Sequence, residues 1–216
     1  EGAKQLKVIG RAGAGVDTID VDAATAKGIA VMNAPDGNTL AAAEHAISLL
    51  FSLARHVPRA DAGMKAGQWP KAGLTGFELE GKRLGVIGLG RIGSTVARKA
   101  QGIGMDVAAF DPFLPASAAG KGSVSLKTLD ELLAWADIIT LHIPRTKDTT
   151  NLIGETQMRT MKKGAYLVNA ARGGLIDEDA LLRLLDEGHL AGAALDTFAT
   201  EPLQADSPLR AHPKLI

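Results

Sequence analysis

The chain of 216 residues contains no cysteine, only 4% aromatic residues and no net charge. Without cysteine there is no disulfide bond, thiolate nucleophile or cysteine-ligated zinc, and a cytoplasmic location is expected. Because 24 Lys and Arg residues balance 24 Asp and Glu residues, the chain has no net charge that would attract nucleic acid or a membrane surface. No apolar run approaches the roughly 20 residues that cross a bilayer. We therefore expect a globular protein that binds neither nucleic acid nor membrane.

Glycine, with 25 residues, and hydrophobic residues, at 46%, are abundant, which suits tight turns around a sizeable core. From Gly81 onward short apolar runs alternate with helical stretches. Apolar runs that are separated by crossover helices predict a doubly wound α/β fold with a parallel sheet, the Rossmann fold. The predicted strands are 84–88, 107–110, 138–143, 166–169 and 192–195, and the predicted helices are 91–103, 126–135, 155–161 and 179–187.

Residues 1–80 have a different pattern. Runs at 7–10 and 29–32, with a short helix at 23–27 between them, predict one β-α-β piece. A helix then runs from about Leu40 to His56, capped by Asn38 or Thr39 and ended by Pro58. We place the remnant of a second domain at 1–34 and the dinucleotide-binding domain, with this bridging helix, at 35–216. Both ends look like interior sequence, so we expect a piece of a longer protein.

A glycine-rich turn carries the clearest chemical signal. The first predicted strand runs into Gly88-x-Gly90-x-x-Gly93 and then into a helix. Gly88 permits a tight turn, Gly90 lets the backbone approach a pyrophosphate, and Gly93 lets helix and strand pack closely. The next predicted strand ends on Asp111, whose carboxylate can accept both ribose hydroxyls of an adenosine but would repel a 2′-phosphate. The pattern predicts NAD as cofactor, rather than NADP or a metal.

Arg172 follows another predicted strand, within Asn169-Ala170-Ala171-Arg172-Gly173-Gly174. Ligands of open α/β sheets bind at this edge, where a guanidinium can grip a carboxylate or polarise a keto oxygen. A lone arginine more often caps a helix or forms a surface ion pair. The glycines after Arg172 leave room for a ligand, and this favours the functional interpretation.

Asp196 and Glu201 follow the last predicted strand. Asp196 can accept a hydrogen bond from a nicotinamide carboxamide. Glu201 can orient a histidine and raise its pKa, which would keep that histidine protonated for acid catalysis. Solvated loop carboxylates or helix caps would have the same spacing, so the residues alone leave both alternatives open.

Taken together, these motifs resemble those of the D-2-hydroxyacid dehydrogenases. The matching stretches include Gly10–Asp17, Met32–Pro35, Leu141–Pro144 and Asp196–Pro202, and they span nearly the whole chain. The resemblance implies a flavodoxin-like second domain that binds a small-molecule substrate. It also implies that residues 40–69 form a homodimer or a larger homo-oligomer, and the alternative is a helix that covers only its own core. It implies substrate contacts at Arg11, Ala14, Gly15 and Asn38, and catalytic roles for Arg172 and Glu201. The implied cofactor contacts are the three glycines and Arg91, Ile92, Asp111, His142, Ile143, Pro144, Ala170 and Asp196.

One departure from the family pattern bears on activity. Hydride transfer from an alcohol needs a base for the hydroxyl proton, and the resemblance places that histidine beyond Ile216. We therefore expect this chain to bind NAD without turnover. For the intact protein three interpretations remain: oxidation of 3-phosphoglycerate in serine biosynthesis, reduction of glyoxylate, hydroxypyruvate or another 2-oxoacid, and NAD sensing without catalysis.

Overall fold

The computed structural model describes residues 5–69, 71–114 and 124–216. Its contacts group the chain into two compact units, Glu1–Ala42 and Ala43–Ile216. The division falls inside helix α2 (Thr39–Arg55), the predicted bridging helix. The domain boundary between residues 34 and 35 stays a prediction, because α2 contributes residues to both units.

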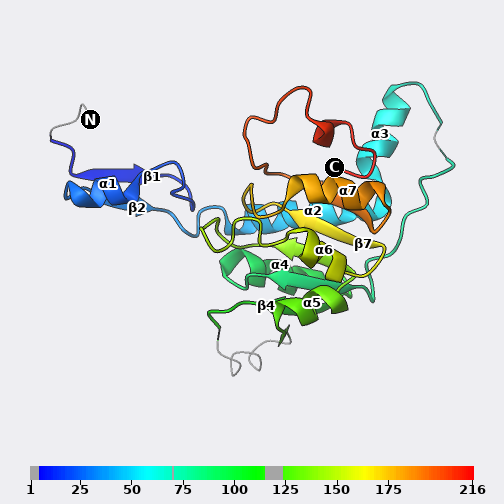
Figure 1. Cartoon of the computed structure of the whole chain (residues 1–216), viewed down its shortest axis with the longest axis horizontal. Coiled ribbons are helices and arrows are strands. Elements are labelled where there is room, and N and C mark those ends of the chain that lie inside the picture. The colour runs from blue at the N-terminus through cyan, green and yellow to red at the C-terminus, as the bar shows by residue number, and fades with distance from the viewer. Residues whose placement is uncertain (1–4, 70, 115–123) are drawn as a thin grey trace. The chain divides into compact units, whose positions relative to one another are not determined.

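The first unit contains the predicted β-α-β piece. Strands β1 (Val8–Arg11) and β2 (Ala30–Asn33) pair in parallel, with α1 (Val21–Ala26) between them in sequence (Figure 1). Asp20 begins α1, because its side chain accepts a hydrogen bond from the N–H of Ala23. A short helix between parallel strands is the connection that the apolar pattern predicts.

The second unit is built on a six-stranded sheet in the order β5-β4-β3-β6-β7-β8, in which every pair is parallel. The chain begins in the middle at β3, moves outward to β5, returns to β6 and continues outward to β8. This is the strand order of a doubly wound dinucleotide-binding fold. The strands are β3 (Arg83–Ile87), β4 (Asp106–Phe110), β5 (Ser125–Leu126), β6 (Ile138–Leu141), β7 (Ala165–Asn169) and β8 (Leu190–Leu195).

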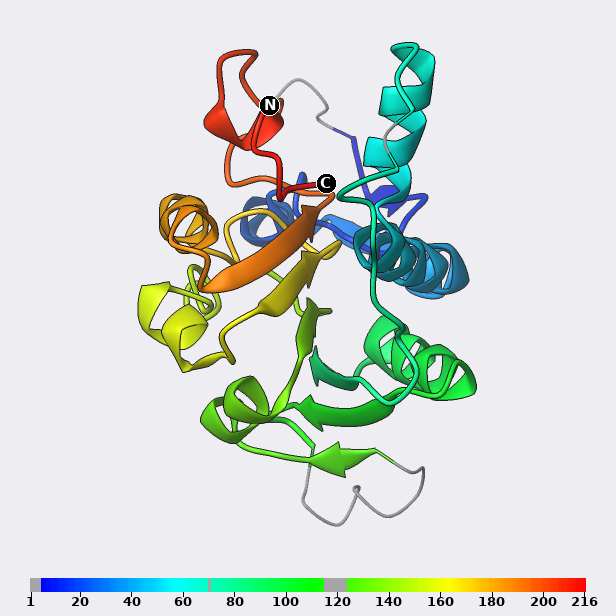
Figure 2. The same ribbon diagram turned by 90° about the vertical axis from the view of Figure 1, so that its right-hand side faces the viewer.

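Helices cover both faces of this sheet (Figure 2). One face packs against α5, α6 and α7, and the other packs against α2 and α4. The central strands are therefore buried on both sides, which explains their continuous apolar runs. No helix of the described ranges is long and apolar enough to cross a membrane. The helices after α2 are α3 (Val57–Lys65), α4 (Arg91–Gly102), α5 (Leu129–Trp135), α6 (Glu155–Thr160) and α7 (Glu178–Asp186), followed by a 3₁₀ turn at Pro208–Arg210.

The helix predicted to end before Pro58 ends at Arg55, and Pro58 itself lies in the first turn of a further helix, α3, where its missing N–H costs nothing. His56, with a φ of 53°, makes the bend between α2 and α3. The helix predicted to begin at residue 126 begins at Leu129, since Thr128 and Glu131 form a capping box.

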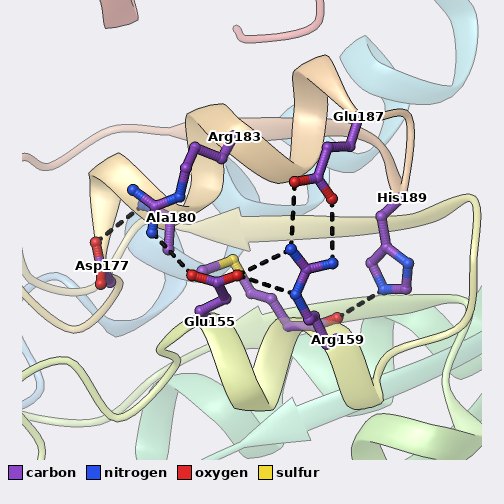
Figure 3. A network of polar contacts seen from close by, with 8 residues as sticks. Glu155, Arg159, Asp177, Ala180, Arg183, Glu187 and His189 are labelled. Atoms are coloured by element: carbon purple, nitrogen blue, oxygen red, sulfur yellow. Dashed lines mark hydrogen bonds and ion pairs between the residues drawn. The ribbon is translucent and has the colours of Figure 1, made fainter.

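An ion-pair network joins α6 to α7 on the surface (Figure 3). Glu155 binds Arg159 on its own helix and Arg183 on α7, and Arg159 also reaches Glu187 at the end of α7. The hydrogen bonds from Arg183 and Arg159 lower the pKa of Glu155. The ring of His189 lies 3.0 Å from a carbonyl of α6. These contacts link the helices that precede β7 and β8.

Candidate dinucleotide-binding and active site

Strand register aligns five predicted site residues at one edge of the sheet. The last residues of β3, β4, β6, β7 and β8 pair with one another across the sheet. Parallel strands end at the same edge, so the residues that follow also form a row. The members of this row, in spatial order, are Asp111, Gly88, His142, Ala170 and Asp196.

The glycine turn has the shape that a pyrophosphate requires. Gly88 has a φ of 90°, and a Cβ there would lie 2.6 Å from the backbone oxygen of His142. A Cβ on Gly93 would lie 1.9 Å from the backbone oxygen of Gly88, so helix and turn make contact without a side chain between them. A Cβ on Gly90 would meet nothing within 4 Å. The space is open where a ligand is expected, next to Arg91 and Ile92 at the N-terminus of α4, which no side chain caps.

The carboxylate of Asp111 is held by the backbone beside this turn. Oδ2 accepts from the N–H of Leu89 at 2.9 Å, and Oδ1 accepts from the N–H of Phe113 at 3.0 Å. A carboxylate has about four acceptor positions, so two such bonds orient it and leave acceptor capacity for a ribose diol. The residues present therefore fit an adenine dinucleotide without a 2′-phosphate.

His142 lies against the glycine turn as a neutral imidazole. Burial lowers its pKa to about 4. Its Nε2 is 3.0 Å from the hydroxyl of the fully buried Thr140. Ile143 packs against Gly88, and Pro144 accepts a hydrogen bond from the hydroxyl of Thr149 through its carbonyl oxygen. This segment forms a wall of the turn and adds no positive charge to it near neutral pH.

A buried asparagine shapes the turn that carries Arg172. The Oδ1 of Asn169 accepts from the N–H of Ala171, and its Nδ2 donates to the carbonyl of Arg172. Asn169 was not among the predicted site residues, although a polar residue that ends an apolar strand is a signal of such a role. The side chain of Arg172 donates to the carbonyl of Ala171 at 2.7 Å.

The prediction that the two glycines after Arg172 leave room for a ligand is wrong. A Cβ on Gly173 would lie 1.7 Å from the backbone oxygen of Phe198, and one on Gly174 would lie 3.0 Å from the guanidinium of Arg145. Both positions are filled by protein. The contact with Phe198 instead brings the Arg172 turn against the loop after β8.

That loop contains Asp196 and Glu201. Asp196 Oδ1 lies 3.1 Å from His45 Nε2 of α2, a neighbour that sequence spacing could not reveal. Glu201 accepts from the N–H of Phe198 through Oε1 at 2.9 Å. Nearby Glu178 has a raised pKa, chiefly because it is buried. The structure thus brings Arg172 and Glu201 onto adjoining loops at the cofactor edge.

The predicted substrate contacts lie in the first unit. Arg11 ends β1, and Ala14 and Gly15 follow in the loop before α1. That loop is tied to β2, because Asn33 donates to the carbonyl of Ala14 at 2.8 Å. Asn38 precedes α2, where its carbonyl accepts from Ala42. The substrate roles of these residues stay predictions.

Comparison with known proteins agrees with this geometry. The sequence model of the family described as "D-isomer specific 2-hydroxyacid dehydrogenase, NAD binding domain" matches residues 47–216. The chain belongs to this family. The family match together with the parallel six-stranded sheet confirms the predicted fold class, and a family described as NAD-binding confirms the predicted cofactor.

The relatives of this chain include proteins with different named activities. A D-3-phosphoglycerate dehydrogenase of Archaeoglobus fulgidus is 51% identical over 97% of the chain, which spans 40% of that protein. The crystal structure of the TT0316 protein from Thermus thermophilus has a TM-score of 0.91 at 39% identity, covering 99% of this chain and 68% of that one. A glyoxylate reductase from Paecilomyes thermophila has a TM-score of 0.88 at 37% identity, covering 97% and 63%.

Substitution of Gly93→Ala should abolish NAD binding and destabilise the protein by about 3 kcal/mol, because the new methyl group overlaps the backbone oxygen of Gly88. The matched control is Gly102→Ala at the end of the same helix, where a Cβ meets nothing within 4 Å. The control should bind NAD normally and be no less stable than the wild type. Calorimetric titration with NAD and urea denaturation measure both effects, and a Gly93→Ala variant that behaved like the control would contradict the packing described.

His142 should make stability depend on pH. Its pKa of about 4 in the folded chain lies below the ordinary value of 6.5, so the unfolded state takes up a proton first as the pH falls. Stability from this group is complete above pH 6.5 and is lost progressively towards pH 4. Between pH 7 and pH 4.5 the loss should be about 2 kcal/mol.

The measurement compares urea denaturation of the wild type and His142→Gln at the two pH values. The difference in unfolding free energy between these proteins should shrink at the lower pH, because glutamine takes up no proton. An unchanged difference would show that the imidazole of His142 does not titrate below its ordinary range.

Proposed function

We propose that the protein containing this chain oxidises 3-phosphoglycerate to 3-phosphohydroxypyruvate with NAD, in serine biosynthesis in the cytoplasm. The observation that carries the proposal is the adjacency of the Arg172 turn and the Glu201 loop at the cofactor edge of the sheet. The name of the Archaeoglobus relative supports the choice of substrate. Because the chain spans about 40% of that relative, the activity proposed is that of the whole protein.

Each residue has a chemical role in this proposal. Arg172 grips the substrate carboxylate and polarises the oxygen on the reacting carbon. Glu201 orients the histidine that takes the hydroxyl proton and raises the pKa of that histidine. Asp196 accepts from the nicotinamide carboxamide. NAD, when bound, supplies the hydride acceptor, and a small-molecule hydroxyacid loses one hydride and one proton.

The histidines of the described chain do not supply this proton acceptor. His45 pairs with Asp196, His142 with Thr140, His189 with a carbonyl of α6, and His212 with Asp186. His56 lies at the start of α3. Within the residues that the structure describes, no hydrogen bond or ion pair joins any of these five histidines to Glu201, so we propose that the 216-residue chain binds NAD without turning over substrate.

A second candidate activity is reduction of glyoxylate or hydroxypyruvate. The likeness to the Paecilomyes glyoxylate reductase favours it, and the cofactor edge would serve either direction of hydride transfer. A non-catalytic NAD sensor is a third candidate. A sensor has no need of an arginine and a glutamate on adjoining loops beside the cofactor, so we rank it below both enzymes.

The full-length protein should produce NADH from NAD and 3-phosphoglycerate, measured by absorbance. NADP should support a rate at least about 100-fold lower at the same concentration, because Asp111 repels its 2′-phosphate. Faster consumption of NADH with glyoxylate or hydroxypyruvate would favour the second activity. No measurable turnover of any 2-hydroxyacid or 2-oxoacid tested, while NAD still binds, would favour the sensor and refute the proposed enzyme.

We also propose that α2 and α3, within residues 40–69, form a homodimer or a larger homo-oligomer. The two helices differ in what they cover. Helix α2 buries five residues in its own core, whereas α3 buries only Gly63. Around α3, Met64 is 52% exposed and Trp69 is 79% exposed, and both line a cavity of about 270 Å³. An apolar surface of this kind is typical of a protein interface.

Substitution of Met64→Asp should convert the oligomer to a monomer, since a carboxylate would be buried at the contact. Phe113→Asp is the control, because Phe113 is also apolar and 92% exposed but follows β4 instead of lying near α3. Light scattering of the full-length protein should show a loss of mass for Met64→Asp alone. A wild-type protein that was already monomeric would contradict the assigned interface.

A further inference from the structure

His45 of α2 holds the carboxylate that follows β8. Its Nε2 lies 3.1 Å from Asp196 Oδ1, and both side chains are about half exposed. An ionised carboxylate can only accept hydrogen bonds, so Nε2 carries the proton that it donates. The two residues are distant in sequence, and only the packing of α2 on the sheet brings them together.

The architecture dictates this pairing. Ala194 of β8 lies in the same apolar cluster as Ala43 and Ala46 of α2. Side chains alternate along a strand, so the position two residues after Ala194 points to the α2 face again. That position is Asp196. His45, between the two buried alanines of α2, is therefore directed to the end of β8 by the helix packing that also builds the core.

The pair leaves one oxygen of Asp196 available at the cofactor edge. Oδ1 is occupied by His45, while Oδ2 makes no hydrogen bond with any part of the chain that the structure describes. The backbone N–H of Asp196 donates to the carbonyl of Asn169 at 2.9 Å, which fixes the start of the loop. Backbone and side chain are thus both held, and Oδ2 keeps its acceptor capacity for a ligand.

We propose that His45 is a positioning residue, which orients Asp196 so that Oδ2 accepts from the carboxamide nitrogen of the nicotinamide. This inference rests on the proposed function, which assigns the carboxamide to Asp196. Preorganisation of an acceptor strengthens binding, because the rotamer is fixed before the ligand arrives. His45 therefore favours the complete dinucleotide over a ligand that lacks the nicotinamide.

ADP-ribose provides the test, because it keeps the adenosine and pyrophosphate of NAD but has no carboxamide. In calorimetric titrations of the 216-residue chain, His45→Ala should weaken NAD binding about five-fold and change ADP-ribose binding less than two-fold. His45→Gln should recover part of the loss, since its amide N–H can donate to Asp196. In an Asp196→Ala background, His45→Ala should have no further effect.

Glu44→Gln is the matched control. Glu44 is the neighbour of His45 on α2 and also makes one ion pair to another element, 2.9 Å to Lys99 of α4. This substitution should leave the affinities for both ligands unchanged. Equal losses for NAD and ADP-ribose in His45→Ala would show a merely structural role, and no loss for either would show no role; both outcomes overturn the inference.

The proposed function fails in a different way. A wild-type chain that is folded but binds neither NAD nor ADP-ribose would overturn the dinucleotide site and the role of His45 with it. A wild-type chain that binds both, with a His45→Ala variant that binds them equally well, overturns the role of His45 alone.

Discussion

The alignment of parallel strand ends is the constraint on which the site depends. Backbone hydrogen bonds fix the register of β3, β4, β6, β7 and β8. The residues that follow these strands then form a row, which contacts between their own side chains are not needed to set. A shift of one residue in any strand would reverse the faces of its side chains and also move its site residue out of the row. Core packing and ligand binding are therefore fixed by the same hydrogen bonds.

Much of this could be predicted from sequence, because the signals are local. The apolar runs gave the strands of the large sheet except the two-residue β5, and the spacing of Gly88, Gly90 and Gly93 gave the turn. Periodicity and turn chemistry depend on neighbours along the chain, which a single sequence contains. The start of α5 could also have been predicted from sequence, since Thr128 and Glu131 have the spacing of a capping box.

What could not be predicted involves contacts between distant segments. No pattern near His45 or Asp196 relates the two, since their pairing results from the packing of α2 on the sheet. Gly173 also depends on such a contact. The backbone of Phe198 occupies the space that a side chain at Gly173 would need, and the sequence could not distinguish this from space left for a ligand. Such contacts are set by tertiary structure, and propensity carries no information about them.

Gly90 and Gly93 are three residues apart in one motif, yet a side chain is excluded from them for different reasons. At Gly93 any side chain collides with the chain itself, so selection for folding alone would keep glycine there. At Gly90 nothing in the described protein opposes a methyl group, so only a bound molecule can exclude one. In a lineage that lost its ligand but kept its fold, position 90 would drift first, which makes it the more sensitive record of whether the site is still used.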